Sequence, residues 1–357
     1  MTVMNLEPIL SADVYASRIG RTLNSGFVAL MISVGHRTRL FDTMASLPPS
    51  TSLDIATAAG LTERYVREWL GAMTTARIVH YDLRTSTYFL PIEYAAVLSR
   101  GAGTASLAPA AQMLALLAGV EDQVVAGFQN GGGVIPEAYG RLEALLGEEK
   151  RELVDDDYVE AVLALMPGMD LRLAAGITVL DAGCGDGVML TALARKFPRS
   201  AFRGYDVSFE AIERANAILD EAGPANVDLA VGDVASLEEH RAYDLILAME
   251  SIHEQPFPRL VLRNLNNALR RDGVFLMQEV AASSYLARNV ENPFAPMLYA
   301  LSLMHAVPRA LAQEGEALGR MWGEERARQM LAEAGFGKLS FQSIVTDPLR
   351  YYCVAMK

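Results

Sequence analysis

The chain has 357 residues, of which 51% are hydrophobic and 21% are charged, so it is long enough for two folded domains with a buried core. Its net charge of -12 argues against DNA or RNA as the main partner, because a nucleic-acid binder needs a basic stripe. No apolar run is long enough to span a membrane, no signal-peptide pattern opens the chain, and its two cysteines suit a reducing compartment, so we expect a cytoplasmic protein.

Residues 1–105 show the pattern of a small helical domain. Apolar residues recur at helical spacing on both sides of a glycine turn, Thr62 stands where a side chain can cap the second helix, and two short β-rich runs follow. Helix, turn, helix and hairpin in this order are typical of a winged helix, which we expect here. These parts occupy residues 53–56, 60–62, 65–70, 78–82 and 87–90.

A winged helix is also used by DNA-binding regulators, so such a regulator is one alternative for this protein. Residues 1–130 contain nine Arg, no Lys and ten acidic residues, which leaves no net positive charge. The second expected helix places acidic residues 63 and 68 beside its arginines, a poor match for phosphate groups. We therefore expect no nucleic-acid partner.

Residues 106–175 are expected to be helical apart from three consecutive glycines at 131–133. Such a glycine run indicates a hinge or a place where the backbone approaches another part of the molecule closely. We expect this segment to link two domains and to contribute to the cover of an active site.

Residues 176–357 alternate short apolar β runs with helical stretches. This alternation predicts an α/β domain with a Rossmann-like, largely parallel sheet and helices on both of its faces. Seven strands are expected, at residues 178–181, 201–206, 227–231, 243–249, 274–280, 339–344 and 351–356.

The clearest motif, VLDAGCGDG at residues 179–187, joins the first of these strands to the next helix. Its three glycines let the backbone turn tightly and leave room for a ligand beside it. A dinucleotide site needs another glycine where Val188 stands, and Asp181 before the turn repels a phosphate but attracts an ammonium group. The motif therefore favours S-adenosylmethionine, which carries an ammonium and a sulfonium, over NAD.

Two further acidic residues come after strands in the positions that such a ligand needs. Asp206 ends the second strand, where a carboxylate can accept protons from ribose hydroxyls, and Asp233 after the third strand suits the adenine amino group. Met249 ends the fourth strand, where it can pack near the adenine or the methionine tail. The residues expected to bind S-adenosylmethionine are Asp181, Gly183, Cys184, Gly185, Asp206, Val207, Asp233, Val234 and Met249.

With these motifs the chain resembles a class I S-adenosylmethionine-dependent methyltransferase. More narrowly, it resembles a group of bacterial small-molecule enzymes with an N-terminal winged-helix domain, typified by an uncharacterised mycobacterial member. The resemblance covers nearly the whole chain and rests on residues 62–70, 131–134, 139–140, 181–187, 252–258, 269–273 and 319–323. It implies the strand order 3-2-1-4-5-7-6 with the last strand antiparallel, and a homodimer built through the N-terminal helices. Where the family usually has His-Asp this chain has His253-Glu254, and Ile135-Pro136 replaces a usual Pro-Tyr.

The methyl acceptor is expected beside strand ends that face the cofactor. His253 follows the fourth strand, and because histidine titrates near neutral pH it can take a hydroxyl or amine proton as the methyl group arrives. Glu254 can orient His253, and Glu279 at the end of the fifth strand points toward the same place. The segment 283–323 is an insertion of the kind that forms a lid. The candidate catalytic residues are His253, Glu254, Tyr139 and His305, and the candidate pocket residues are Tyr299 and Met304.

The main hypothesis is O- or N-methylation of a small molecule with His253 as the base. One alternative is S-methylation of a small thioether acid, which needs no base because the sulfur is already nucleophilic; the DNA-binding regulator is the other. No spaced set of His, Asp or Glu predicts a metal site, so we expect a mechanism without a metal.

Overall fold

A computed structural model describes residues 9–357, with the side chains of residues 103–105 and 222 left out of the description. The first eight residues of the expected N-terminal domain therefore lie outside the described part. The chain forms two compact units, residues 1–119 and 120–357. The division falls inside the segment 106–175 that was expected to link two domains.

The first unit is a helical domain with a short β-hairpin. Thr51 caps α3 through its side chain, whereas Thr62 precedes α4 as expected but makes no capping hydrogen bond. The core packs around Trp69, whose ring lies edge-on to Phe41 at 5.2 Å between centroids and whose Nε1 donates to the Met31 carbonyl. Its elements are α1 (Ala12–Arg37), α2 (Leu40–Ser46), α3 (Ser52–Ala59), α4 (Glu63–Thr75), β1 (His80–Asp82), β2 (Thr87–Phe89), α5 (Ile92–Leu98), η1 (Arg100–Ala105) and α6 (Ala108–Ala118).

Helix α1 is long, and most of its length adds nothing to the core of this unit. Residues from its last third pack on the core cluster, while an apolar row at four-residue spacing stays exposed. Residues four apart lie on one face of a helix, so this row forms a single apolar stripe. The row consists of Tyr15, Ile19, Leu23 and Phe27.

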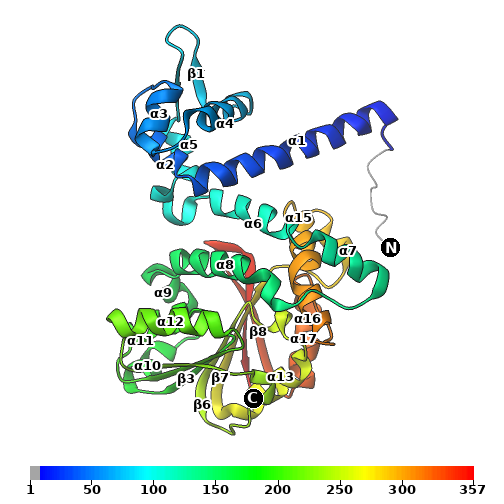
Figure 1. The fold of residues 1–357 in the computed structure, drawn as a ribbon. Coiled ribbons are helices and arrows are strands. Elements are labelled where there is room, and N and C mark those ends of the chain that lie inside the picture. The colour runs from blue at the N-terminus through cyan, green and yellow to red at the C-terminus, as the bar shows by residue number, and fades with distance from the viewer. Residues whose placement is uncertain (1–8) are drawn as a thin grey trace. The chain divides into compact units, whose positions relative to one another are not determined.

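The second unit is a seven-stranded sheet with helices on both faces (Figure 1). The strands lie in the order β5-β4-β3-β6-β7-β9-β8, which is 3-2-1-4-5-7-6 when counted from the first strand of this sheet. The five strands from β5 to β7 pair in parallel, and β9 is antiparallel to both of its neighbours. The strands are β3 (Thr178–Ala182), β4 (Ala201–Asp206), β5 (Val227–Val231), β6 (Tyr243–Met249), β7 (Leu269–Val280), β8 (Lys338–Ile344) and β9 (Asp347–Met356).

The core of this unit lies on both faces of the sheet because side chains alternate along each strand. In β6, Leu245 and Leu247 pack against the helices of one face, and Ile246 and Ala248 pack against those of the other. The first face is covered by α9 (Asp156–Ala164), α10 (Met169–Ala175), α11 (Val188–Lys196) and α12 (Phe209–Ala222). The second is covered by α13 (Pro258–Ala268) and α17 (Gly323–Glu333).

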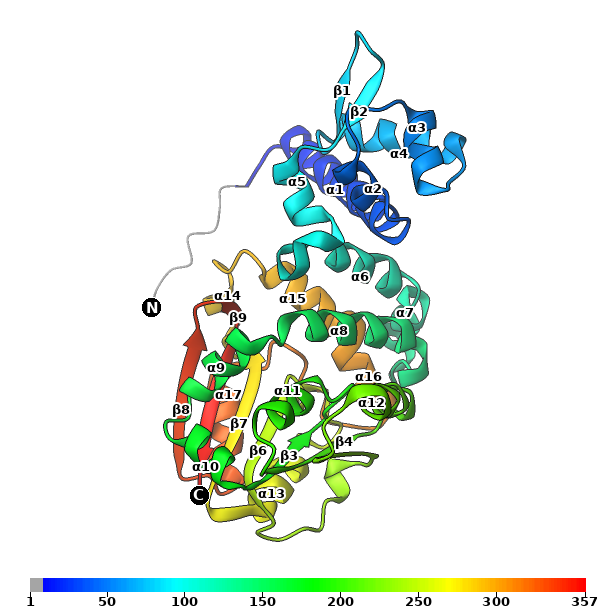
Figure 2. The same cartoon turned by 90° about the vertical axis from the view of Figure 1, so that its left-hand side faces the viewer.

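The remaining helices lie at the end of the sheet where the parallel strands finish. Helix α8 crosses above the carboxyl ends of these strands (Figure 2). Segment 281–322, between β7 and α17, is the helical insertion that was expected from the sequence. These elements are α7 (Glu121–Asn130), η2 (Pro136–Tyr139), α8 (Gly140–Leu153), η3 (Val234–Ser236), η4 (Ile252–Glu254), α14 (Leu286–Asn289), α15 (Ala295–Leu301), the π-helical turn η5 (Ser302–Ala306) and α16 (Val307–Ala312).

The triple glycine allows the chain to pass directly against α16. Val134 donates its backbone N–H to the Pro308 carbonyl at 3.0 Å. A Cβ at Gly133 would lie 2.0 Å from that carbonyl oxygen and 2.3 Å from the Ala312 nitrogen, so only glycine fits there. The glycines therefore mark a close approach of the backbone to the inserted helices.

Candidate active site

The glycine turn after β3 brings backbone and carboxylate groups together at the ends of two neighbouring strands. Gly183 has a φ of +80°, and a Cβ on it would lie 2.6 Å from the Ser251 Cβ. The N–H of Gly185 donates to Asp206 Oδ2 at 2.8 Å, and Asp206 Oδ1 accepts from the Ser208 N–H at 2.9 Å. The turn after β3 is thus joined to the end of β4 by the hydrogen bond between Gly185 and Asp206.

Two carboxyl groups lie at these strand ends, Asp181 buried and Asp206 partly buried. Asp181 is buried, and its Oδ1 finds no hydrogen-bond partner among residues 9–357. Burial raises the pKa of Asp181 to about 7, with the charge of Lys150 opposing the rise and that of Asp206 adding to it. Burial also raises the pKa of Asp206, against the effect of its two backbone hydrogen bonds. A ligand carrying a positive charge can relieve this costly arrangement of buried acids.

Lys150 on α8 extends into the same region. Its ammonium lies 3.4 Å from the Met249 carbonyl oxygen at the end of β6. Asp186, within the glycine turn, is paired with Arg151 and, at 3.0 Å, with Arg214. The carboxylate of the turn itself is therefore neutralised, which leaves Asp181 and Asp206 as the acids available to a cationic ligand.

The other residues expected at the cofactor site have varied surroundings. Asp233 is exposed, and its side chain caps η3 by accepting from the Ala235 N–H at 2.8 Å. Val207 is exposed, whereas Cys184, Val234 and Met249 are buried and pack in the cores that flank the sheet. Each of these residues lies at the carboxyl end of β3, β4, β5 or β6 or shortly after it, so all of them are at the same end of the sheet.

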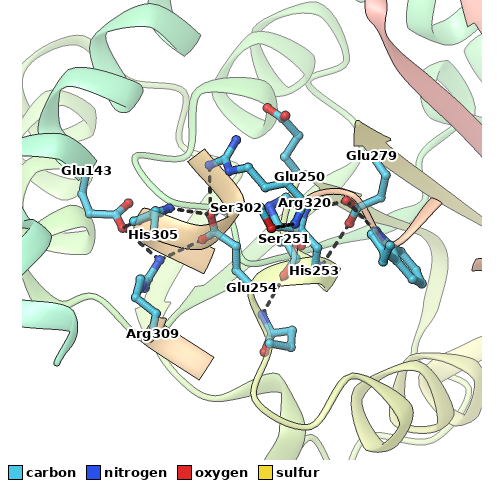
Figure 3. A network of polar contacts seen from close by, with 12 residues as sticks. Glu143, Glu250, Ser251, His253, Glu254, Glu279, Ser302, His305, Arg309 and Arg320 are labelled. Carbon is cyan, nitrogen blue, oxygen red and sulfur yellow. Dashed lines mark hydrogen bonds and ion pairs between the residues drawn. The ribbon is translucent and has the colours of Figure 1, made fainter. Parts of the chain in front are cut away.

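His253 is fully buried in η4 and is held by Glu279 from the end of β7 (Figure 3). Its Nδ1 lies 2.5 Å from Glu279 Oε2, and its backbone N–H donates to Glu279 Oε1 at 3.2 Å. Trp322 Nε1 donates to Glu279 Oε2 at 3.2 Å, which fixes the carboxylate from its far side. Because an ionised carboxylate only accepts, this contact requires a proton on Nδ1. Nε2 is buried and has no hydrogen-bond partner within the described structure.

Glu254 lies between two arginines of the inserted segment (Figure 3). Its Oε2 is 2.9 Å from Arg309 Nη1, and its Oε1 is 3.3 Å from Arg320 Nη2. Burial on its own favours the neutral acid, but the nearby cationic side chains, Arg309 first, outweigh it and hold the pKa of Glu254 below its usual range. Glu254 is therefore a permanently ionised group beside His253.

His305, from the π-helical turn, joins the same network. Its Nε2 is 3.0 Å from Glu143 Oε1 of α8, and its Nδ1 is 3.6 Å from Glu254 Oε1. Glu143 also pairs with Arg309 at 2.9 Å. A π-turn inside a helical segment is a feature often found at functional sites, and here it aims His305 at the two glutamates.

Tyr139 of η2 and Met304 of η5 adjoin His305, whereas Tyr299 of α15 contacts Asn289 of α14. Tyr139 is buried, its hydroxyl donates to the Met304 carbonyl at 2.8 Å, and its ring lies edge-on to His305. Burial raises the pKa of Tyr139 to about 12, which makes it a poor base at neutral pH. Tyr299 is at the border of exposure and accepts from Asn289 at 3.1 Å.

Sequence reasoning missed the charged residues that complete the site: Glu143, Lys150, Asp186, Arg309 and Arg320. These residues are far from His253 along the chain, and no spacing pattern links them to it. One sequence signal could have indicated the two arginines, namely the prediction that segment 283–323 forms a lid. Arginines on a lid that covers the strand ends can pair with acidic residues at those ends.

Neither a metal centre nor a membrane span is found within residues 9–357. No three His, Cys, Asp or Glu side chains are grouped so as to hold a metal ion in this part of the chain. No helix in the same range combines the length and apolar character needed to cross a bilayer.

Comparison with known proteins gives a family for each unit. Residues 26–100 match the family described as Rv2258c-like winged HTH domain, and residues 173–341 match a methyltransferase domain. The first match lies in the helical unit with the hairpin, and the second covers most of the seven-stranded sheet.

Curated relatives align with this chain over about a third of its length. (S)-coclaurine N-methyltransferase of Papaver somniferum is 29% identical over 109 residues, 30% of this chain and 31% of the relative. Ubiquinone biosynthesis O-methyltransferase of Neisseria meningitidis is 30% identical over 115 residues, 31% of this chain and 46% of the relative. The chain thus spans less than half the length of these two relatives.

Solved structures share the fold over nearly the whole chain. Human N-acetylserotonin methyltransferase in complex with S-adenosylmethionine has a TM-score of 0.71 and 16% identity, covering 98% of this chain and 99% of that one. At such low identity the likeness concerns the fold alone. The chain is therefore a two-domain protein of the methyltransferase class, in which an Rv2258c-like winged helix-turn-helix domain precedes a Rossmann-like methyltransferase domain.

Proposed function

We propose that this protein transfers the methyl group of S-adenosylmethionine to a small-molecule acceptor whose attacking oxygen or nitrogen carries a proton. The observation that carries this proposal is the His253–Glu279 pair: a buried imidazole with Nδ1 fixed by a carboxylate and Nε2 unpartnered in the described residues. An acceptor that needs no deprotonation has no use for such an arrangement.

The residues at the ends of β3 and β4 fit the proposed donor. Asp181 presents an unpaired carboxylate oxygen, within the described chain, to a cationic group, and Asp206 lies where a ribose hydroxyl can donate to it. Gly183 and Gly185 leave the backbone of the turn open to the ligand, and Asp233 and Met249 border the proposed adenine end. When bound, S-adenosylmethionine supplies a methyl carbon activated by its sulfonium.

The protein's part in the chemistry is to position the acceptor and to take its proton. His253 Nε2 accepts the proton of the attacking hydroxyl or amine, and Glu279 stabilises the imidazolium that results, with Trp322 holding the carboxylate in place. Glu254, His305 and Tyr299 belong to the proposed acceptor side, and the inserted segment excludes water from it.

The test is turnover of a panel of small hydroxyl and amine compounds by the wild type and by His253→Ala. We expect the substitution to lower turnover by about a hundredfold or more while the affinity for S-adenosylhomocysteine stays within about twofold. A loss of only a few fold would contradict a role as base and favour methylation of a thioether or simple positioning.

We also propose that the protein is a cytoplasmic homodimer that pairs through α1. Four large apolar side chains form an exposed stripe on this helix, and Phe27 is 69% exposed. A second copy of α1 offers the same stripe, which a two-fold symmetric interface can bury.

A further inference from the structure

Glu254 lies beside the proposed base without making a hydrogen bond to it. The distance from Glu254 Oε1 to His253 Nε2 is 3.7 Å, longer than any N–H···O hydrogen bond. His253 is fully buried, so no bulk water separates the two groups. The gap is therefore a property of how Glu254 is held.

The arginines of the inserted segment hold Glu254 at this distance (Figure 3). Arg320 contacts the oxygen that faces His253, at 3.3 Å, and Arg309 contacts the other oxygen at 2.9 Å. Both arginine side chains are largely buried, with exposed fractions of 12% and 14%. Each oxygen of the carboxylate is thus in contact with one arginine.

The gap matters because a carboxylate in contact with Nε2 would block the base. An ion pair with Glu254 would stabilise protonated His253, raise its pKa and occupy the position from which Nε2 accepts the acceptor's proton. Nε2 has no partner within residues 9–357 only while Glu254 stays back.

We infer that Arg320 and Arg309 are positioning residues that keep Glu254 off His253 and so leave the base free. This inference rests on the proposed role of His253 and assigns the two arginines a part in it that goes beyond fold stability. Arg320 contacts the oxygen that faces the imidazole, so its substitution tests the inference most directly.

The charged groups around this contact come from several helices, a strand and the loop before α17. Glu279 of β7 faces His253 on its Nδ1 side, and Glu254 of η4 faces its Nε2 side. Glu254 in turn faces Arg320, Arg309 of α16 and His305 of η5. Glu143 of α8 contacts Arg309 and His305 and so shares both of these side chains with Glu254.

The experiment measures the pKa of His253 directly, without an acceptor. The full-length protein is labelled with 13C at histidine Cε1 and titrated by NMR; it has five histidines, and the signal lost in His253→Asn identifies the one of interest. Four proteins are compared: wild type, Arg320→Met, Glu254→Gln and the double variant. Binding of S-adenosylhomocysteine by calorimetry checks that each one keeps an intact donor site.

We expect Arg320→Met to raise the pKa of His253 in the protein that retains Glu254. This rise should be at least about one unit larger than the rise that Arg320→Met causes in the Glu254→Gln protein. Arg320→Lys, which keeps the charge, should stay within about half a unit of the wild type. Equal shifts in the two backgrounds would show only the loss of a distant positive charge, and would overturn the inference.

Two further outcomes are decisive in the same way. If Arg320→Met does not fold, Arg320→Gln, which keeps hydrogen-bond donors but loses the charge, is compared with and without Glu254→Gln under the same criterion. If the wild-type protein does not bind S-adenosylhomocysteine, the proposed function is wrong. The positioning role is judged separately, by whether the effects of the Arg320 and Glu254 substitutions on the pKa of His253 are coupled.

Discussion

Asp181 is buried at the end of β3 with one carboxylate oxygen unpaired among the described residues, and burial raises its pKa to about 7. Because this pKa is higher than the usual value near 3.8, the folded protein binds more protons than the unfolded chain between about pH 4 and 7. The contribution of Asp181 to stability therefore falls as the pH rises through this window. A residue that costs stability in its ionised form is well suited to bind a positive charge.

The affinity for the donor should consequently depend on pH through Asp181. An ammonium group binds the ionised form, so S-adenosylhomocysteine should bind about tenfold more weakly at pH 6 than at pH 8. Calorimetry at the two pH values measures this ratio. Asp181→Asn should bind weakly with little pH dependence, whereas Asp228→Asn, on an exposed ion pair, should behave as the wild type. A wild-type affinity that is flat with pH would count against Asp181 as the ammonium ligand.

Glu279 should control the activity of His253 without touching the donor. Replacement by Gln keeps the shape but weakens both the hold on Nδ1 and the stabilisation of the imidazolium, so we expect turnover to fall by about a hundredfold. Trp322→Phe, which removes one hydrogen bond to Glu279, should cost about tenfold or less. Single-turnover rates with an acceptor from the panel provide the measurement, and unchanged rates in Glu279→Gln would exclude the pair from the chemistry.

At the scale of secondary structure, the sequence predicted the sheet well. Strands β4, β5 and β6 begin and end at the expected residues. Only β6 is a run buried on both faces, whereas β4 and β5 alternate buried with more exposed residues and are bounded by polar turns. Strand β7 begins at Leu269, earlier than expected, since Leu269 pairs with Tyr243 and the intervening residues 270–273 form an irregularity before regular pairing resumes at Val274. A local pattern gives no sign of such a long bulge.

The site was predicted less completely than the sheet, and the reason is physical. Asp181 and Asp206 are marked by their places after strands, where topology alone brings them together. Glu143 meets His305 and Arg309 only because α8 and the inserted helices pack over the strand ends, and helix packing leaves no fixed spacing in the sequence. Glu254, a possible orienting group for His253, lies 3.7 Å from His253 Nε2 and also contacts two arginines that no spacing pattern indicated.

The turn between β3 and α11 should be intolerant of any side chain at Gly183. Its φ of +80° and the 2.6 Å approach to Ser251 make Gly183→Ala strained, with an expected loss of about 2 kcal/mol or more. The melting temperature should then fall by roughly 4–8 °C, together with the affinity for S-adenosylhomocysteine. Gly71→Ala, in the exposed middle of α4 with open space around it, is the matched control and should not lower the melting temperature. Equal melting temperatures for the wild type and Gly183→Ala would contradict this account of the turn.

At the scale of the whole molecule, charge bears on whether the winged helix binds DNA or serves in dimerisation. The net charge is -12, and Arg64 and Arg67 of α4 are already paired with acidic residues of the same helix. We expect no specific band in a gel shift with genomic fragments at low salt. A sequence-specific band would restore the DNA-binding alternative.

The same domain should instead govern the oligomeric state. Leu23→Asp places a charge in the middle of the α1 stripe and should convert a dimer into a monomer in sedimentation experiments at micromolar concentration. Arg18→Asp, on the same helix but outside the stripe, is the control for a change of charge. A wild-type protein that sediments as a monomer would refute the proposed pairing.

The close passage of the chain at Gly133 has a consequence for the reaction. Pro308, which accepts a hydrogen bond from Val134, immediately precedes Arg309. Gly133→Ala would push α16 away from the chain at this point. The guanidinium of Arg309, which pairs with Glu254, would shift with the helix. A substitution more than a hundred positions upstream would thus change the distance between Glu254 and His253 Nε2.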